Sequence, residues 1–409
     1  MDNTIDQDRH RITRFIDLPE DDLTIKPHLD AIEQQAQGAD RTRVLDAQLI
    51  ADIRDGEFLK MPASREIGGT EQSIVRIGRE LGAVAYRCPS LAWVLWNHQA
   101  VFHLFAGALG PERADLLTQL MATKSWVSFP AGAGSGVHGR LEGDSVVLNG
   151  QGTFSTGARY GDYCGVVFAV EGPDGTPRRP LDLRFSLVAN DRKGVTIDHS
   201  WDGAGLRASA TDTIHYRDVE IDVANCVSWF GANRAESLRT IDVVNHRYRE
   251  DWVGISDLWL GWMALNVVAR AAADVTAEAT TRKAIMGARM IDRPTVQINI
   301  GKALALTAAA HATIKAACTE VDDRIAGRVV PDTADYLRQQ ATVSMAVDQL
   351  SQAIDLLVKV KGANGMREGD PFERRVRDFR AMPLHINVHA DRITHQLGRY
   401  GLGIELDAF

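Results

Sequence analysis

The spacing of apolar residues changes twice along this 409-residue chain, and those changes limit the folds that it can adopt. From about residue 40 to 125 apolar residues recur three or four apart, which predicts helices with a buried face. Gly and Ser then become dense and short β-rich segments follow, and beyond about residue 250 the helical spacing returns. The order predicts three domains: an N-terminal α-helical domain (1–124), a middle β domain (125–235) and a C-terminal helical bundle (236–409).

Two patterns make the later domains more specific. The segment from Thr213 to Ile221 alternates apolar and polar residues as a strand does, and some ninety residues without a helical period predict a small β-barrel or sandwich. In the C-terminal region apolar residues from Val343 to Leu357 step by four and three, which is typical of a bundle of long antiparallel helices. Pro294 is expected to start or kink a helix, since its ring removes a backbone donor.

Composition excludes several classes of protein. Lys and Arg number 46 against 54 Asp and Glu, a net charge of −8, so no basic field favours nucleic acid or a membrane surface. The apolar stretches fall short of the roughly 20 residues that cross a bilayer. The four cysteines form no CxxC pair, and the first residues do not resemble a secretion signal. We therefore expect a cytoplasmic protein with reduced thiols.

Several local motifs agree with one family. Residues 139–157 (GRLEGDSVVLNGQGTFSTG), 201–225 (WDGAGLRASATDTIHYRDVEIDVAN) and 372–382 (FERRVRDFRAM) resemble segments of the acyl-CoA dehydrogenase superfamily. The resemblance implies an α+β fold: an N-terminal all-α domain, a middle β-barrel or sandwich and a C-terminal four-helix bundle. In that family the first of these segments lines the flavin.

One segment separates two branches of the superfamily. Dehydrogenases commonly carry a Tyr-Glu-Gly-Thr segment whose Glu removes a proton from the substrate, whereas this chain has Leu384, His385, Ile386, Asn387 and Val388 there. A His at this place resembles the flavin-dependent monooxygenases of the dibenzothiophene monooxygenase and hydroxyphenylacetate hydroxylase type.

That branch implies a two-component enzyme. A separate flavin reductase supplies reduced flavin, FMN or FAD, and the oxygenase uses O2 to hydroxylate a small aromatic or a nitrogen- or sulfur-containing substrate, as a homotetramer. No GxGxxG nicotinamide motif follows a strand in this sequence, which agrees with a partner reductase. The alternatives are an acyl-CoA dehydrogenase-like FAD desaturase with a relocated base, and a catalytically inactive binding subunit.

Two histidines are the candidate catalytic residues. His385 has the position that the resemblance marks, and an imidazole can move a proton near neutral pH; the alternative is a core histidine with its bonds satisfied. His98 follows an apolar helical run, with a packing role beside Asn97 as the alternative. His385 and His389 are four residues apart, but no carboxylate completes a metal-binding pattern, so no metal site is expected.

The candidate cofactor-binding residues come from three segments. The resemblance places Ser155, Thr156 and Gly157 beside the flavin, and Ser128 could also donate a hydroxyl; the alternative for these side chains is a bond to the local backbone. Gly362 lies in 359–365 (KVKGANG), a loose match to the family's Gln-x-x-Gly-Gly segment. The family's Arg-x-x-Phe-Gly segment has no clean counterpart, which favours a flavin that exchanges over one that stays bound.

Three other features have simpler expectations. The glycines of 130–136 (PAGAGSG) could hold a phosphate, but no P-loop Lys follows, so a loop is the alternative. Trp93 and Trp96 are expected in the core more than in a substrate cage. The charged cluster of Arg377, Asp378 and Arg380 is expected to serve the fold.

Overall fold

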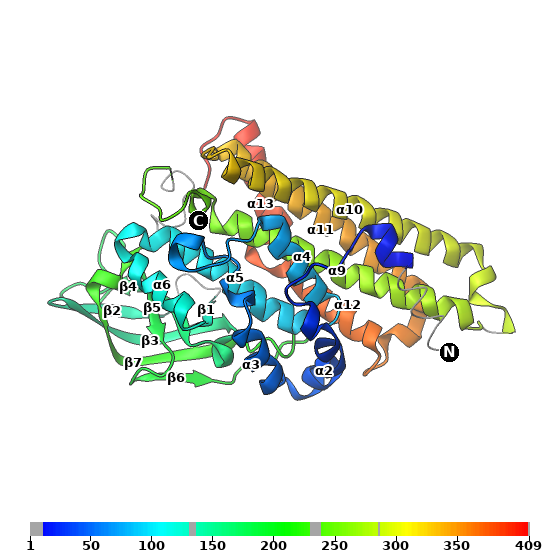
Figure 1. Cartoon of the computed structure of the whole chain (residues 1–409), viewed down its shortest axis with the longest axis horizontal. Helices are drawn as coiled ribbons and strands as arrows, with labels where there is room; N and C mark the ends of the chain where they lie inside the picture. Colours follow the sequence, from blue (N-terminus) through cyan, green and yellow to red (C-terminus); the bar gives the residue numbers. More distant parts are fainter. Residues whose placement is uncertain (1–10, 131–135, 230–238, 285–286, 408–409) are drawn as a thin grey trace.

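The computed structural model describes residues 11–130, 136–229, 239–284 and 287–407. Helices make up the first part of the chain, strands the middle and helices the last part (Figure 1). The N-terminal helices are α2 Leu29–Thr42, α3 Ala47–Asp55, α4 Ile74–Ala85, α5 Pro89–Leu109 and α6 Ala114–Ala122. The C-terminal helices are α9 Trp252–Thr281, α10 Pro294–Ala326, α11 Thr333–Lys361, α12 Pro371–Ala381 and α13 Ala390–Gly401.

The strands form a single sheet in the described part of the chain. They are β1 Val127–Pro130, β2 His138–Glu142, β3 Ser145–Thr156, β4 Tyr163–Val170, β5 Leu183–Ala189, β6 Val195–Asp198, β7 Asp212–Asp222 and β8 Val227–Ser228. Their order is β6-β7-β3-β1-β4-β5-β8, and β2 also pairs with β3 and β4. Strands β1 and β2 each pair with both β3 and β4. The sheet therefore curls around an apolar core of its own.

Helix α5 lies between the sheet and the bundle (Figure 1). It is apolar on almost every face, and such a helix is stable only where neighbours cover it on all sides. Pro89 occupies its first turn, where the missing N–H costs nothing. We would expect Ser90 to cap this helix from the sequence, but Cys88 holds that position, and Ser90 Oγ instead accepts from Ala208 N at 3.3 Å.

The C-terminal bundle has the core that its spacing predicts. Val343, Leu350 and Leu357 are completely buried on α11, and Pro294 starts α10 as expected. Helix α9 is long and apolar enough to cross a membrane by composition, contrary to the expectation that every apolar stretch is too short. However, 89% of its most apolar window is buried inside the protein, so it is the core helix of the bundle.

The charged cluster on α12 ties the units together, which confirms its expected role in the fold. Arg377 pairs with Asp40 of α2 at 2.9 Å, and Asp378 Oδ1 accepts from Leu206 N at 2.6 Å in the loop before β7. These contacts link the first helices, the sheet and the bundle through one helix.

Candidate functional site

Helix α5 brings together segments from both ends of the chain. Trp93 and Trp96, one turn apart, face His385, whose ring centroid lies 5.6 Å from Trp93 and 5.0 Å from Trp96, edge-on to both. The neighbouring Val94 faces the end of β3, where a Cβ on Gly157 would lie 3.0 Å from Val94 Cγ1. The two segments that the sequence selected, around His385 and around Gly157, therefore meet on adjacent faces of one helix.

His385 has a defined protonation state in this setting. Its Nδ1 accepts a hydrogen bond from Asn387 N at 3.3 Å, so in the neutral ring the proton is on Nε2. Burial, and secondarily the charge of Arg392, lowers the pKa of His385 to about 4. At neutral pH the side chain is therefore an uncharged imidazole with one N–H to donate, and not the group titrating near neutrality that the sequence suggested.

The bundle closes the site from the other side. Trp96 Nε1 donates to Ser256 O at 2.9 Å, and Asn387 Nδ2 donates to Ser256 Oγ at 3.1 Å. Ser256 lies near the start of α9, so α5, α9 and the short helix η12 (Ile386–Val388) converge at one residue. Sequence reasoning named Asn387 only as part of the segment around His385, and it did not select Ser256, which stands in no recognisable motif.

His98 is not at this site. It is fully buried in the middle of α5, its Nε2 lies 2.9 Å from Leu59 O, and its Nδ1 accepts from Val127 N at 3.1 Å. Burial lowers the pKa of His98 to about 4, so the ring is neutral. Both ring nitrogens are engaged with the backbone, which favours the packing role over the catalytic one.

This assignment predicts a loss of stability in the His98→Leu variant. The substitution leaves a buried N–H and a buried C=O without partners, which costs about 3 kcal/mol of unfolding free energy. Urea denaturation measures the cost, with the exposed His199→Leu as the control. Turnover per folded molecule is expected to stay near that of the parent protein; a specific loss of turnover would return His98 to the chemistry.

The candidate hydroxyls differ in their partners. Ser128 Oγ donates to Tyr163 O at 3.2 Å, and Thr156 Oγ1 lies 3.2 Å from Thr211 Oγ1, so the structure favours local bonding for both. Ser155 Oγ is buried without a hydrogen-bond partner among the described residues. Of the three, Ser155 alone has no hydrogen bond to a nitrogen or oxygen atom in the described part of the chain, and its hydroxyl interacts with the buried thiol of Cys164.

An aromatic pair next to these residues fits a flavin better than the hydroxyls do. Phe154 has a φ of 58°, in a bulge between Gly152 and Ser155, and its side chain is 56% exposed. Its ring centroid lies 6.3 Å from that of Trp201. Trp201 N donates to Asp212 Oδ1, and Trp201 Nε1 donates to Leu206 O at 2.9 Å, so the indole is fixed.

Phe154 and Trp201 present an exposed aromatic surface beside the hydroxyl of Ser155. Gly157, close by, approaches α5. Such a surface suits a planar ring system with polar edges. The residues present thus fit a flavin. The bulge explains why the sequence alone does not select Phe154: a regular strand would turn that side chain differently.

Gly362 lies at the opposite end of the bundle. It ends α11 with a φ of 64°, next to Lys361, which pairs with Glu278 of α9. Glu278 is 22 residues along α9 from Ser256, or about 33 Å at 1.5 Å per residue. Within one chain Gly362 therefore does not reach the site around His385, and its role in binding a flavin stays a prediction.

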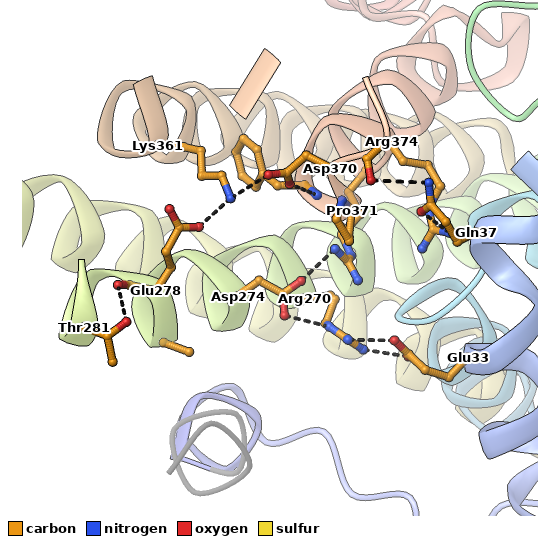
Figure 2. A pocket seen from close by; sticks show the side chains of 14 residues that line it. Glu33, Gln37, Arg270, Asp274, Glu278, Thr281, Lys361, Asp370, Pro371 and Arg374 are labelled. Atoms are coloured by element: carbon orange, nitrogen blue, oxygen red, sulfur yellow. Dashed lines mark hydrogen bonds and ion pairs between the residues drawn. The ribbon is translucent and has the colours of Figure 1, made fainter. Parts of the chain in front are cut away.

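A pocket of about 500 Å³ opens at that distant end, between α2, α9 and α12 (Figure 2). Its walls carry ion pairs: Arg270 with Glu33 at 2.7 Å, Arg375 with Asp274 at 2.6 Å, and Lys361 with Asp370 at 3.0 Å. Paired charges of both signs mark a structural network and not the chemistry around His385.

Two further expectations concern metals and phosphate. The described residues contain no group of three or more His, Cys, Asp or Glu placed to hold a metal ion. His389 is separated from His385 by η12, so the two do not share a helical face as their spacing suggested. The glycine-rich segment 130–136 falls mostly on 131–135, outside the described residues.

Comparisons with known proteins agree with the geometry. Residues 258–390 match the family model described as acyl-CoA dehydrogenase, C-terminal domain. The structure superposes on XiaF from Streptomyces sp., solved in complex with FADH2 and glycerol, with a TM-score of 0.86 and 19% identity, covering 99% of this chain and 98% of that one. The chain thus has the acyl-CoA dehydrogenase fold, and the resemblance expected from its sequence is confirmed.

The sequence relatives include both branches of the superfamily. The chain is 22% identical to the flavin-dependent monooxygenase, oxygenase subunit HsaA, of Rhodococcus jostii over 385 residues, covering 92% of this chain and 97% of that protein. It is 25% identical to the mitochondrial short-chain specific acyl-CoA dehydrogenase of Mus musculus, covering 92% and 89%.

Proposed function

We propose that this protein is the oxygenase component of a two-component flavin-dependent monooxygenase, which acts on a small aromatic or a nitrogen- or sulfur-containing substrate. The observation that carries the proposal is the neutral imidazole of His385 against Trp93 and Trp96, at the place where a dehydrogenase of this fold carries its carboxylate base. The similarity to HsaA and XiaF supports it, and a separate reductase would supply the reduced flavin.

Reduced flavin would supply two electrons, so that one atom of dioxygen enters the substrate and the other leaves as water. Phe154 and Trp201 would hold the ring system, and Ser155 would donate to a polar atom at its edge. His385 would donate a hydrogen bond from Nε2 to the oxygen that is transferred, and the indoles of Trp93 and Trp96 would keep water away from it.

The low pKa of His385 predicts a particular pH profile. The imidazole is neutral above pH 5 and becomes cationic only below its pKa of about 4, where Nδ1 could no longer accept from Asn387 N. The oxygenation rate should therefore show no break near pH 6.5 and should fall only as the pH approaches 4. Single-turnover product formation from pH 4 to 8 checks this, and a break near 6.5 that disappears in His385→Gln would contradict it.

The dehydrogenase alternative needs a base from another position. Asp251 and Asp257 are carboxyls on and before α9, close in sequence to Ser256. Burial raises the pKa of Asp251 to about 7 and that of Asp257 well above its usual range. Asp251 Oδ1 accepts from Val253 N, and Asp257 Oδ2 accepts from Gln340 Nε2, so both carboxyls are held within the bundle, which disfavours this alternative.

Flavin binding tests the proposal directly. We expect anaerobic equilibrium dialysis to show binding of reduced FMN or reduced FAD, and Phe154→Ala to weaken it about 10-fold, the loss of roughly 1.4 kcal/mol of ring contact. A preparation that binds neither reduced flavin, or one that carries bound FAD bleached by an acyl-CoA, would contradict the monooxygenase proposal.

The proposal includes a homotetramer. Four apolar side chains are well exposed at the C-terminal end, on and after α13: Leu397, Tyr400, Leu402 and Ile404. A second copy would cover such a surface. In an assembly, the Gly362 end of one chain could approach the site of another. Light scattering coupled to size exclusion gives the number of chains, and a monomer would contradict this part.

A further inference from the structure

The segment that carries His385 is fixed from outside by one side chain. Arg392, in the first turn of α13, donates from Nε to Ile386 O at 2.8 Å and from Nη2 to Asn387 O at 2.9 Å. A single guanidinium therefore holds two consecutive carbonyls of η12, with the forked geometry that only arginine offers. On the other side, Asn387 is held by Ser256 of α9.

Val388, at the end of η12, is 2% exposed and anchors the segment to the core, but the side chains next to His385 do not. A three-residue helix of this kind has little stability of its own. The apolar side chains that flank His385 lie largely in solvent: Leu384 is 74% exposed and Ile386 is 56% exposed. Burial of those side chains therefore cannot decide where the imidazole points, and the hydrogen bonds of Arg392 and Asn387 must do so.

We propose that Arg392 is the positioning residue for His385: it fixes η12 so that the imidazole faces Trp93 and Trp96. This inference rests on the proposed function for its catalytic meaning, but the positioning itself is a property of the protein without flavin. Arg392 bonds to the backbone of η12, and it acts on the chemistry through His385.

The charge of Arg392 supports the same role. It is a fixed cation that disfavours a second cation on His385. The charge of Arg392 also acts on three ionisable groups of the neighbouring helices: Asp251 just before α9, Asp257 on α9 and Tyr336 on α11. The pKa of each of these groups is raised. From α5 only the uncharged indoles face the imidazole. Arg392 thus holds the ring in place, and its charge adds to the burial that keeps the ring neutral.

The test compares Arg392→Met, Arg392→Lys and a matched control, Arg399→Met. Arg399 lies two turns further along α13, and its Nε donates to Glu405 O, away from His385. Hydrogen–deuterium exchange at histidine Cε1, followed by mass spectrometry across pH, gives the pKa of His385 in flavin-free protein. Single-turnover product formation and the affinity for reduced flavin are measured in parallel.

We expect Arg392→Met to raise the pKa of His385 from about 4 toward 6.5 and to lower product formation about 10²-fold, the cost of misplacing a reacting group by about 1 Å. Affinity for reduced flavin should change little. Arg392→Lys keeps the positive charge but cannot form both hydrogen bonds to η12, so its pKa shift and its loss of product formation should be intermediate. It also provides the test if the Met variant does not fold. Arg399→Met should match the parent protein.

Unchanged His385 exchange in both Arg392 variants, or an equal change in Arg399→Met, would overturn the positioning role while leaving the proposed function standing. If instead the pKa of His385 rises in Arg392→Met but the parent protein oxygenates nothing, the positioning role holds and the proposed function fails.

Discussion

Replacing His385 by Ala is expected to lower product formation by about 10²-fold or more while leaving the affinity for reduced flavin nearly intact. The imidazole is the polar group that α5 and η12 place against Trp93 and Trp96, and its Nε2 is the ring nitrogen left free by the Asn387 contact. Its recorded contacts do not include Phe154, Trp201 or Ser155, so removing it should not disturb the flavin. Single-turnover assays with excess substrate and pre-bound reduced flavin separate the two effects.

His395→Ala is the matched control for that variant. His395 lies on α13 with a side chain that is 58% exposed and a single recorded contact, 3.5 Å to Asp407. It should behave like the parent protein in both assays. Unchanged turnover in His385→Ala would remove His385 from the mechanism, and an equal loss in His395→Ala would point to a general effect on the C-terminal helix.

A large effect on stability is expected from Asp274→Asn, in the ion network of Figure 2. Asp274 accepts from Arg270 at 3.0 Å and lies 2.6 Å from Arg375, whose side chain is 2% exposed. Burial lowers the pKa of Arg375 to about 10, so its charge is held at a cost even with this partner. Neutralising Asp274 leaves a buried guanidinium uncompensated, and we expect the unfolding free energy to fall by about 3 kcal/mol.

Asp355→Asn provides the comparison, because Asp355 also pairs with an arginine, Arg380, but both side chains are about half exposed. Exposed pairs of this kind contribute under about 1 kcal/mol. Urea unfolding of the two variants should therefore differ by about 2 kcal/mol or more. Equal stabilities would mean that the network on α9 does not depend on its charges.

The order of helices and strands could be predicted because burial leaves a period in the sequence. Ile74 and Leu81 on α4 and Val343 and Leu357 on α11 are completely buried, as their spacing indicated. Element ends were less predictable: Ser90 looks like a cap, which would start the helix at Leu91, yet the helix starts two residues earlier at Pro89 because proline suits the first turn.

The site was predictable only where the family resemblance marked a residue. Spacing alone does not distinguish His385 from His98, since both are histidines beside apolar residues; the difference lies in whether the backbone satisfies both ring nitrogens, as it does for His98. Trp93 and Trp96 are core residues, as expected, and also face His385. Contacts between distant parts of a chain leave no period that a single sequence can show.

The source of the oxygen in the product tests the central claim most directly. Protein loaded with reduced flavin is mixed with isotopically labelled dioxygen and a panel of phenols, indoles, amines and sulfides, and the products are read by mass spectrometry. We expect one labelled oxygen atom in the product of at least one compound, dependent on the protein and lost in His385→Ala. If reduced flavin reoxidises at its free-solution rate and no compound gains label, the protein is not a monooxygenase.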